Sequence, residues 1–566
     1  MPRLPDGRYR FDSLEELPPV AVSLGSTAWN RTGDWRSREP VFADQRPPCT
    51  HGCPTEQDIV DQLRLCAQGR IREAGELLLS ANPFPATTGR VCPHPCTASC
   101  NRGQMDGVVD IPGVEAAIGD ELISDGFVPA RRPRVGGRVA VVGAGPAGMT
   151  AAHYLALAGL EVVLYDRDER PGGLLRTGIP PYRLPRRALD AEIDRALRCV
   201  EFVGQRALGR DLQLGTLKQE HDAVLVAVGR HAPRPLGLEG EGSGGVHDGL
   251  GLLAELHRGQ PAPAGKRVVV IGGGNTAMDC ARSLLRAGRS VGVFYRRDRA
   301  SMPAFVDEVE EALEEGVKIE EWVLPEALLL EGGKVRAIRF VRARPGAPDS
   351  SGRPRPEPIP SSGFVVEADL VVVAAGEVLD AGPFEKSLLT GGFVAADATL
   401  ETRMPGVWAS GDCLGGGGTV AEAIAQGRRT AAAIARKLGV AGPEPDLLAA
   451  RGAGADVIGF DRIRPHYFAA VPAVPRSKID VQSRLGGGEV RVALAHAQAS
   501  AAAVRCLSCG TCTGCDNCFQ FCPDQAVVRD APGRYRADVA RCKGCGICVT
   551  ECPRGACVLH DLGENG

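Results

Sequence analysis

Short runs of apolar residues that end in glycine-rich turns occur twice in the chain, and a segment with helical spacing of its apolar positions follows each turn. The first unit, residues 139–166, reads "VAVVGAGPAGMTAAHYLALAGLEVVLYD" and the second, residues 268–298, reads "VVVIGGGNTAMDCARSLLRAGRSVGVFYRRD". A buried strand, a tight turn, a helix and a second strand in this order are typical of nucleotide-binding α/β folds. The pattern therefore predicts two Rossmann-like domains.

The turn of the first unit contains Gly143, Gly145 and Gly148. Glycine permits the tight turn and lets backbone N–H groups approach a pyrophosphate at the N-terminus of the following helix. Asp166, at the end of the second apolar run, can hydrogen-bond a ribose hydroxyl. A glycine-rich turn without a ligand is the alternative, but strand, helix, second strand and acid together favour a dinucleotide site.

The second turn repeats this arrangement with Gly272, Gly274 and Ala277, but no acid follows it. Arg296 and Arg297 occupy the equivalent place, and basic side chains there suit the 2′-phosphate of NADPH. Two arginines on an exposed loop also occur by chance. NADP(H) is therefore the favoured nucleotide and NAD(H) the alternative.

A third glycine-rich segment, "PGVWASGDCLGGGGTVAEAIAQ", predicts a further contact to a bound dinucleotide. Its strand ends in Gly411 and Asp412, and Asp412 can bond a ribityl hydroxyl. A helix is expected to begin near Thr419, and the positive end of its dipole favours negative charge on a reduced ring. The Pro-, Ser- and Arg-rich residues 343–363 predict the tip of a hairpin in the nicotinamide domain.

Cysteines are concentrated in two parts of the chain, and the first part is a predicted helical region near the N-terminus. Cys66 falls on the apolar face of an amphipathic segment and is interpreted as packing. The other cysteines of this region, with their adjacent prolines, favour iron–sulfur ligation. Zinc is the alternative, although zinc pairs usually have histidine partners. The five candidate ligands are Cys49, Cys53, Cys92, Cys96 and Cys100.

The second part is the C-terminal tail, which contains two copies of the run Cys-x2-Cys-x2-Cys-x3-Cys-Pro. Bacterial ferredoxins with two 4Fe–4S clusters have this run, and the fourth cysteine of each copy ligates the other cluster. A pair of zinc knuckles is the weaker alternative. One predicted cluster takes Cys512, Cys515, Cys518 and Cys552, and the other takes Cys542, Cys545, Cys548 and Cys522.

Composition sets the broad class of the protein. At 566 residues the chain is too long for one hydrophobic core. Its net charge of −3 does not indicate binding to nucleic acid or to an anionic membrane. The first 19 residues have no apolar core, which predicts no secretory signal, and no apolar stretch is long enough to span a bilayer. The chain's 20 cysteines then predict metal clusters in a reducing cytoplasm and not a disulfide framework.

Six motifs carry a resemblance to a known family: "GRVCPHPCTASC", "VAVVGAGPAG", "PGGLLRTGIPPYRLPR", "GGGNTAMDC", "YRRD" and "GVWASGDC". Residues 49 to about 440 resemble the small, FAD- and NADPH-binding subunit of bacterial glutamate synthase and the electron-input half of dihydropyrimidine dehydrogenase. The resemblance implies FAD, NADP(H) or NAD(H), and 4Fe–4S clusters as cofactors. The tail is similar to ferredoxin subunits of 2-oxoacid oxidoreductases and to fused NADPH:acceptor flavoproteins, and the ordinary glutamate synthase subunit lacks it.

We therefore expect an α/β fold of two Rossmann-like nucleotide-binding domains, one for FAD and one for NAD(P)H, preceded by a helical iron–sulfur domain and followed by a small α+β ferredoxin domain. The expected segments are an N-terminal extension (1–48), the helical domain (49–135), the first FAD segment (136–232), the NAD(P)H domain (233–375), the second FAD segment (376–440), a linker and docking segment (441–505) and the ferredoxin domain (506–566). The extension is interpreted as an arm that wraps a neighbour or another domain, or as a disordered tail.

The candidate cofactor-binding residues belong to the glycine-rich turns and to the motifs that carry the resemblance. They are Gly143, Gly145, Pro146, Ala147, Gly148, Asp166, Gly173, Arg183, Gly272, Gly274, Asn275, Thr276, Ala277, Arg296, Arg297, Gly411, Asp412 and Thr419.

The resemblance also implies two clusters in the helical domain. In the family, the equivalents of Cys53, Cys92 and Cys96 hold one cluster, with glutamine or a similar side chain as the fourth ligand. Glu115 in "IPGVEAA" matches that fourth position.

The other cluster of the family takes the equivalents of Cys49 and Cys100 together with two cysteines of an N-terminal run R-C-L-x-C. This chain has no cysteine before Cys49, but "VRCLSC" occurs at residues 504–509. We expect Cys506 and Cys509 to replace the missing pair, in the same or a neighbouring chain, which gives four clusters. If the two are spare thiols, three clusters form.

The order of the expected carriers predicts the chemistry. NAD(P)H gives up two electrons as hydride and a 4Fe–4S cluster accepts one, so a flavin must stand between them. No Ser–His–Asp or paired-carboxylate constellation is visible, and no catalytic residue is assigned. The predicted protein is an NAD(P)H:acceptor oxidoreductase that passes electrons to ferredoxin or to the clusters of a partner catalytic subunit, for example of a 2-oxoacid oxidoreductase, in a hetero-oligomeric complex.

Two other functions are considered. The first is a glutamate synthase small subunit that delivers NADPH electrons to a large amidotransferase, which needs no ferredoxin tail. The second is an assembly scaffold without cofactors, which the intact glycines, Asp166, Asp412 and the cysteine runs disfavour.

Overall fold

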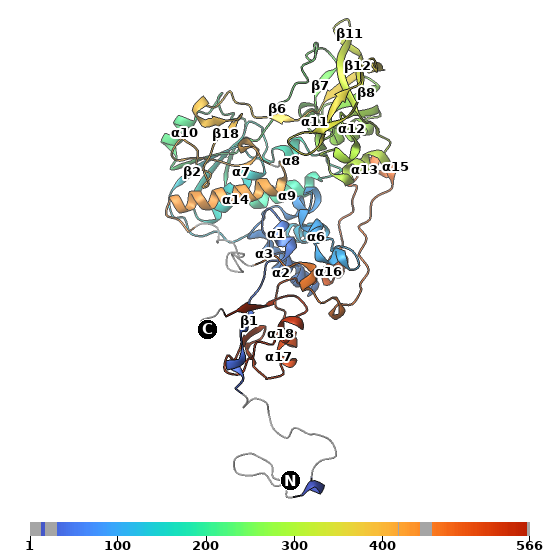
Figure 1. The fold of residues 1–566 in the computed structure, drawn as a ribbon. Coiled ribbons are helices and arrows are strands. Elements are labelled where there is room, and N and C mark those ends of the chain that lie inside the picture. Colours follow the sequence, from blue (N-terminus) through green and yellow to red (C-terminus); the bar gives the residue numbers. More distant parts are fainter. Residues whose placement is uncertain (1–12, 17–30, 417, 442–455, 563–566) are drawn as a thin grey trace.

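The computed structural model of the chain describes residues 13–16, 31–416, 418–441 and 456–562. Two α/β domains lie beside one another, a helical domain adjoins both, and the C-terminal domain projects from the helical domain (Figure 1). Parts of the predicted N-terminal extension and of the predicted linker lie outside the described residues. Among the helices of the described segments, none combines the length and apolarity that crossing a bilayer requires.

The first α/β domain contains a five-stranded parallel sheet in the order β19-β5-β2-β3-β4. Its strands are β2 (Arg138–Val142), β3 (Glu161–Tyr165), β4 (Glu201–Val203), β5 (Ala223–Val226) and β19 (Val407–Ala409). Its helices are α7 (Pro146–Leu157), α8 (Leu174–Thr177), α9 (Arg186–Ala196), α10 (Leu214–Glu220) and α14 (Val420–Lys437). The central strands are buried on both faces, because helices cover the sheet on either side. β19 comes from a segment about 180 residues after β5, so two separate chain segments build this one domain.

The second α/β domain has a parallel sheet in the order β10-β9-β8-β15-β7. Its strands are β7 (Val246–Asp248), β8 (Arg267–Ile271), β9 (Ser290–Phe294), β10 (Lys318–Glu320) and β15 (Leu370–Val373), and its helices are α11 (Gly249–His257), α12 (Asn275–Arg286) and α13 (Val306–Glu314). Two short antiparallel strands, β6 (Ala232–Pro233) and β16 (Glu377–Val378), pair where the chain enters and leaves this domain. The chain thus leaves the first α/β domain after β5, forms the second one and returns to the sheet of the first at β19.

An antiparallel sheet extends from the second α/β domain. Its strands are β11 (Val323–Glu331), β12 (Lys334–Pro348), β13 (Pro354–Pro358) and β14 (Phe364–Glu367). The Pro- and Arg-rich residues 343–363 form the β12–β13 hairpin and its turn, in agreement with the predicted hairpin tip. A second small ladder, β17 (Leu389–Thr390) with β18 (Phe393–Val394), lies in the first α/β domain.

The helical domain consists of α1 (Pro48–Gly52), α2 (Ile59–Ala67), α3 (Ile71–Leu79), α4 (Pro85–Val91), α5 (Pro95–Ala98) and α6 (Ile111–Ser124). Ile59, Leu63 and Cys66 lie three to four positions apart on α2 and face one core, so Cys66 packs as its spacing predicts. The Ala-rich helix α16 (His496–Val504) joins the same core from the far end of the sequence, and its small side chains permit a close approach to α2 and α6.

The C-terminal domain contains α17 (Asn517–Gln520), α18 (Ile547–Thr550) and the strands β20 (Val527–Ala531), β21 (Arg534–Ala537) and β22 (Cys557–Asp561). Strand β1 (Arg38–Phe42), from the predicted N-terminal arm, pairs antiparallel with β22. The Gly33 N–H donates to the Ala540 carbonyl at 3.1 Å. Residues 32–42 of the arm therefore wrap the C-terminal domain of the same chain.

Residues 456–505 bridge the other parts. This docking segment contains α15 (Val481–Leu485), which packs near α13 (Figure 1). Arg484 pairs with Glu314 of the second α/β domain at 2.6 Å, and Arg476 pairs with Asp110 of the helical domain at 2.7 Å. The segment thus fixes the second α/β domain relative to the helical domain.

Candidate functional site

The first glycine-rich turn connects β2 to α7 and leaves one open face. A Cβ on Gly148 would lie 1.9 Å from the Gly143 carbonyl oxygen, and Gly143 itself has φ +108° with the Ala227 carbonyl 2.3 Å from its Cβ position. Nothing lies within 4 Å of a Cβ on Gly145. The outer glycines are required by close packing, whereas Gly145 leaves room for a ligand to approach the backbone at the N-terminus of α7.

Asp166, at the end of β3, faces this turn. Its carboxylate accepts hydrogen bonds from the N–H groups of Ala144 at 2.5 Å and Asp168 at 2.8 Å. Burial raises the pKa of Asp166, and the two N–H donors partly offset the increase. The predicted ribose-binding acid therefore also ties the glycine-rich turn to the neighbouring strand.

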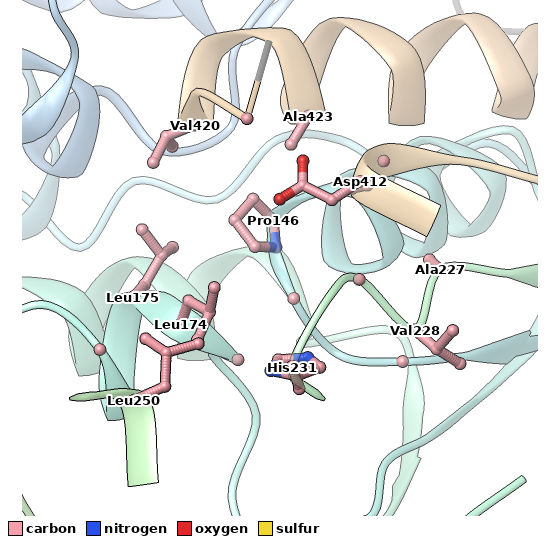
Figure 2. A pocket seen from close by; sticks show the side chains of 18 of the residues that line it. Pro146, Leu174, Leu175, Ala227, Val228, His231, Leu250, Asp412, Val420 and Ala423 are labelled. Carbon is pink, nitrogen blue, oxygen red and sulfur yellow. The ribbon is translucent and has the colours of Figure 1, made fainter. Parts of the chain in front are cut away.

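Asp412 approaches the same turn from the third glycine-rich segment. Figure 2 shows its carboxylate beside Pro146 and below Ala423 of α14. Burial raises the pKa of Asp412, and the Arg230 guanidinium, 3.9 Å from the carboxylate, opposes that shift. Thr419 begins α14 as predicted, and Glu422 closes a capping box with it, with a Thr419 N–H to Glu422 distance of 3.0 Å.

A cavity of about 400 Å³ joins these groups to the start of α12, which follows the second glycine-rich turn. Among the predicted cofactor-binding residues, those that line it are Gly143, Gly145, Pro146, Ala147, Asp166, Gly173, Arg183, Asn275, Thr276, Gly411, Asp412 and Thr419. Gly148, Gly272, Gly274, Ala277, Arg296 and Arg297 are outside that lining. Because the cavity extends from the start of α7 to the start of α12, two nucleotides bound at the two turns would meet in it. The volume is in the usual range for a cofactor site.

The sequence did not indicate the apolar wall of this cavity. Leu174, Leu175 and Leu250 lie across from Asp412, and His231 lies below Pro146 (Figure 2). Burial lowers the pKa of His231 to about 4, so its ring is neutral at physiological pH. Leu174 and Leu175 come from α8, Leu250 comes from α11 and His231 from the segment after β5, so no single local pattern could identify the wall.

The second turn has the same backbone but different flanking chemistry. Gly272 has φ +141°, and a Cβ there would lie 2.1 Å from the Ala374 carbonyl. The two predicted phosphate-binding arginines diverge at the end of β9. Arg296 is exposed, whereas Arg297 is buried and donates to the Pro354 carbonyl at 2.8 Å and to Asp349 at 2.5 Å. Arg297 thus anchors the β12–β13 hairpin, and Arg296 is the arginine that reaches the surface.

Arg183 also has structural partners. Its guanidinium lies 2.7 Å from Asp279 of α12 and 2.8 Å from Glu308 of α13. It lines the cavity, but its charge is shared with two carboxylates of the second α/β domain. Its main contact is therefore between domains, which the sequence motif did not indicate.

The cysteines of the helical domain fall into two groups, of which the first surrounds Glu115. Burial, with a smaller contribution from nearby Glu115 and Cys53, raises the pKa of Cys92 to about 12. Burial likewise raises the pKa of Cys96, with Cys53, Glu115 and Cys92 as charged neighbours. Glu115 accepts hydrogen bonds from Thr88 at 2.6 Å and Asn82 at 2.9 Å, both on one carboxylate oxygen. The predicted ligand set of one cluster is thus brought together, with Val91 and Pro93 of the adjoining segment in the wall of the cavity.

The second group combines cysteines from three segments. Burial raises the pKa of the Cys49 thiol well above its ordinary value, and the thiols of Cys506, Cys509 and Cys100 beside it raise it further. The Asn101 amide donates to the Cys509 sulfur at 3.5 Å.

The C-terminal domain contains a cavity of about 420 Å³ lined by Cys512, Cys515, Cys518 and Cys552. These four are one predicted ligand set of the ferredoxin run. The cysteines of the other set also lie together. Burial raises the pKa of Cys542, and the neighbouring thiols of Cys548, Cys522 and Cys545 raise it further. In the described residues, no three His, Cys, Asp or Glu side chains converge closely enough for a single metal ion.

Three known protein families match successive parts of the chain, which together make up most of its length. Residues 137–427 match the family described as pyridine nucleotide-disulphide oxidoreductase. Residues 42–127 match a domain described as dihydropyrimidine dehydrogenase domain II, 4Fe–4S cluster, and residues 511–557 match a 4Fe–4S dicluster domain. The predicted combination of a nucleotide-dependent oxidoreductase fold with iron–sulfur domains on both sides is confirmed.

Three curated relatives show the range of similar proteins. The β subunit of an NADP(+)-dependent formate dehydrogenase of Moorella thermoacetica is 39% identical over 68% of this chain and 59% of its own length. The β subunit of an NADPH-Fe(3+) oxidoreductase of Geobacter sulfurreducens is 42% identical over 58% of this chain and 51% of its own length. The glutamate synthase [NADPH] small chain of Azospirillum brasilense is 37% identical over 76% of this chain and 94% of its own length. The chain thus spans little more than half of the first two relatives.

Proposed function

Because the chain belongs to the pyridine nucleotide-disulphide oxidoreductase family and covers nearly all of a glutamate synthase small chain, we propose that it is an NADPH-dependent electron-transfer subunit. Electrons enter from NADPH at the second α/β domain, and they leave through the C-terminal domain to ferredoxin or to a partner catalytic subunit. The observation that carries this proposal is the cavity that extends from the first glycine-rich turn to the start of α12, which follows the second turn.

The residues around the first turn fit FAD. The open face at Gly145 admits a pyrophosphate to the N-terminus of α7, and Asp166 and Asp412 offer carboxylates for ribose and ribityl hydroxyls. Bound FAD would supply the conversion between hydride transfer and single-electron transfer. The protein contributes the apolar wall of Leu174, Leu175 and Leu250, which shields that step from water.

Three cysteine groups are proposed as 4Fe–4S sites. Cys53, Cys92, Cys96 and Glu115 hold the site nearest the cavity; Cys512, Cys515, Cys518 and Cys552 hold the first C-terminal site; and Cys542, Cys545, Cys548 and Cys522 hold the second. The thiols in the C-terminal domain include the exposed Cys515 and Cys545, which suits transfer to another protein.

A second candidate function is delivery of electrons to a glutamine-hydrolysing subunit. The 94% coverage of the Azospirillum small chain favours it. The C-terminal dicluster domain favours an iron–sulfur acceptor instead, because an amidotransferase partner needs no such domain.

Anaerobic purification with co-eluting partners tests the proposal. We expect one FAD per chain, bleaching of the flavin by NADPH and NADPH-dependent reduction of methyl viologen or ferricyanide. Mass spectrometry of the co-eluting protein then separates the candidates, since a thiamine-diphosphate subunit indicates 2-oxoacid oxidation and an amidotransferase indicates glutamate synthesis. Reconstituted protein without flavin would refute the proposal.

A further inference from the structure

We propose that Cys49, Cys100, Cys506 and Cys509 form a further 4Fe–4S site at the junction of the helical and C-terminal domains. Cys506 and Cys509 lie between the two matched iron–sulfur domains, which end at residue 127 and begin at residue 511. Neither match therefore assigns them a role. Whether this site binds a cluster does not depend on the proposed function. Its role in electron transfer rests on that function.

The four thiols are buried together although three separate segments supply them. Cys49 is 8% exposed in the core of the helical domain, and Cys100 and Cys506 are half-buried at the edge of that core. Cys509 is also 8% exposed and packs in the adjoining apolar cluster of Ile458, Ile463 and Leu507. Cys506, Cys509 and Cys100 lie close enough to Cys49 to raise the pKa of its thiol, and Cys506 and Cys100 lie close enough to Cys509 to do the same. The four thiols therefore lie near one another, two of them buried and two half-buried.

Hydrogen bonds on the flanking residues hold the segments in place. The Arg102 guanidinium donates to the Arg505 carbonyl at 3.1 Å. Arg505, which is 1% exposed, donates to the Val108 carbonyl at 2.6 Å and to the Asp106 carbonyl at 2.9 Å. These contacts fix the residue before Cys506 against the loop after Cys100.

The Cys49 segment is fixed in the same way. The Gln45 N–H donates to the Gly510 carbonyl at 2.8 Å. A Cβ on Gly510 would lie 2.7 Å from the Gln45 carbonyl oxygen, and Gly510 has φ +72°, so the close approach requires glycine. The residue after Cys509 is therefore joined to the residues just before Cys49.

The donor set matches a cluster better than one ion. Four thiolates are the usual ligands of a 4Fe–4S cluster, whose iron and sulfide atoms keep the thiolates apart. Zinc would draw four sulfurs to about 2.3 Å from one point, and the described residues contain no group that tight. Two N–H donors already point at the sulfurs, from Ser508 to Cys506 at 3.4 Å and from Asn101 to Cys509 at 3.5 Å. Such donors stabilise the thiolate form of a ligand.

The location gives the site a place in the electron path. Cys49 is four residues before Cys53 of the helical-domain site, and Cys509 is three residues before Cys512 of the C-terminal cavity. Oxidation of one NADPH to NADP⁺ and a proton releases two electrons. A cluster held by Cys49, Cys100, Cys506 and Cys509 would pass these electrons one at a time, and clusters at the two C-terminal cysteine sets would accept one each.

Iron analysis of the unmodified, anaerobically purified protein is the first test. Four clusters require about sixteen irons per chain, and three require about twelve. About sixteen irons without zinc supports the site. About twelve irons in protein whose flavin NADPH still reduces overturns it and leaves the proposed function intact. Sixteen irons in protein that NADPH cannot reduce would refute the function and retain the site.

The variant Cys506→Ser, Cys509→Ser is the second test, with Cys199→Ser as a matched control at a half-buried thiol of the first α/β domain. We expect the double variant to lose about four irons and one cluster signal in the electron paramagnetic resonance spectrum. NADPH should still bleach its flavin but no longer reduce the C-terminal clusters, which dithionite still reduces. A double variant with its full iron content refutes the site. If the double variant does not fold, the iron count of the unmodified protein decides.

Discussion

The two nucleotide-binding turns have the same backbone course, and two of the positions at which their units differ are informative. In the first turn the third position is Gly148, where a Cβ would lie 1.9 Å from the Gly143 carbonyl, whereas in the second turn Ala277 occupies that position and is fully buried. At the end of the following strand, the first unit has Asp166 turned toward its own turn, and the second has Arg296 at the surface.

This comparison separates the part of the motif that the fold requires from the part that selects the nucleotide. The close packing of the helix against the preceding strand requires the glycines. This packing is tighter in the first unit, where the third position must be glycine, than in the second, where it is alanine. We expect the charge at the end of the second strand to select the ligand, and in the second unit the hairpin leaves only Arg296 at the surface, because it binds Arg297.

The largest effect is expected from Gly148→Ala. The added methyl group would collide with the Gly143 carbonyl oxygen, which cannot move without separating α7 from β2. The free energy of unfolding should therefore fall by an amount at the upper end of the roughly 1–3 kcal/mol typical of overpacking. We expect loss of FAD and a lower melting temperature, measured by flavin absorbance and calorimetry. The matched change Ala277→Gly should retain FAD and cost only about 1 kcal/mol in helix propensity. Equal effects of the two changes would contradict the comparison.

The next effect concerns the two arginines. Charge-assisted hydrogen bonds contribute about 1.5–3 kcal/mol, so Arg296→Ser should raise KM for NADPH roughly tenfold or more and leave KM for NADH unchanged. Arg297→Ser should mainly lower the melting temperature, because it releases the hairpin from Asp349 and Pro354. Steady-state kinetics with both nucleotides and thermal unfolding distinguish the roles. A larger KM effect from Arg297→Ser would reverse the assignment.

The smallest effect is the pH dependence of the FAD-free protein at Asp412. Burial raises the pKa of this carboxyl group in the folded state, so its contribution to the free energy of unfolding is complete at pH values below the ordinary pKa of about 3.9 and is lost as pH rises through the higher folded value. In the Asp412→Asn variant the side chain does not ionise, so this decrease in the free energy of unfolding with rising pH is absent. The variant should be slightly more stable than the unmodified protein at neutral pH and equal to it in acid, as measured by denaturant unfolding across pH. A constant difference across pH would show that Asp412 does not titrate in this way.

The sequence predicted what depends on local spacing. Strand–turn–helix order located both turns, and the cysteine runs located the C-terminal groups, because each depends on neighbours within about ten residues. It could not predict the partners of Arg183 and Arg297, which lie about 100 and 50 residues away. The orientation of such side chains is decided by tertiary packing, and either arginine would look equally available in the sequence.

The pairing of β1 with β22 has a consequence for synthesis. Arg38 and Asp561 are partners although about 520 residues separate them. At about 5–20 residues per second, translation leaves β1 without its partner for roughly half a minute to two minutes. During that interval an edge strand that ends in Val41 and Phe42 is open to other nascent chains on the same messenger, and an unpaired edge is a template for aggregation. A chaperone that covers exposed strands during translation should therefore increase the yield of folded protein.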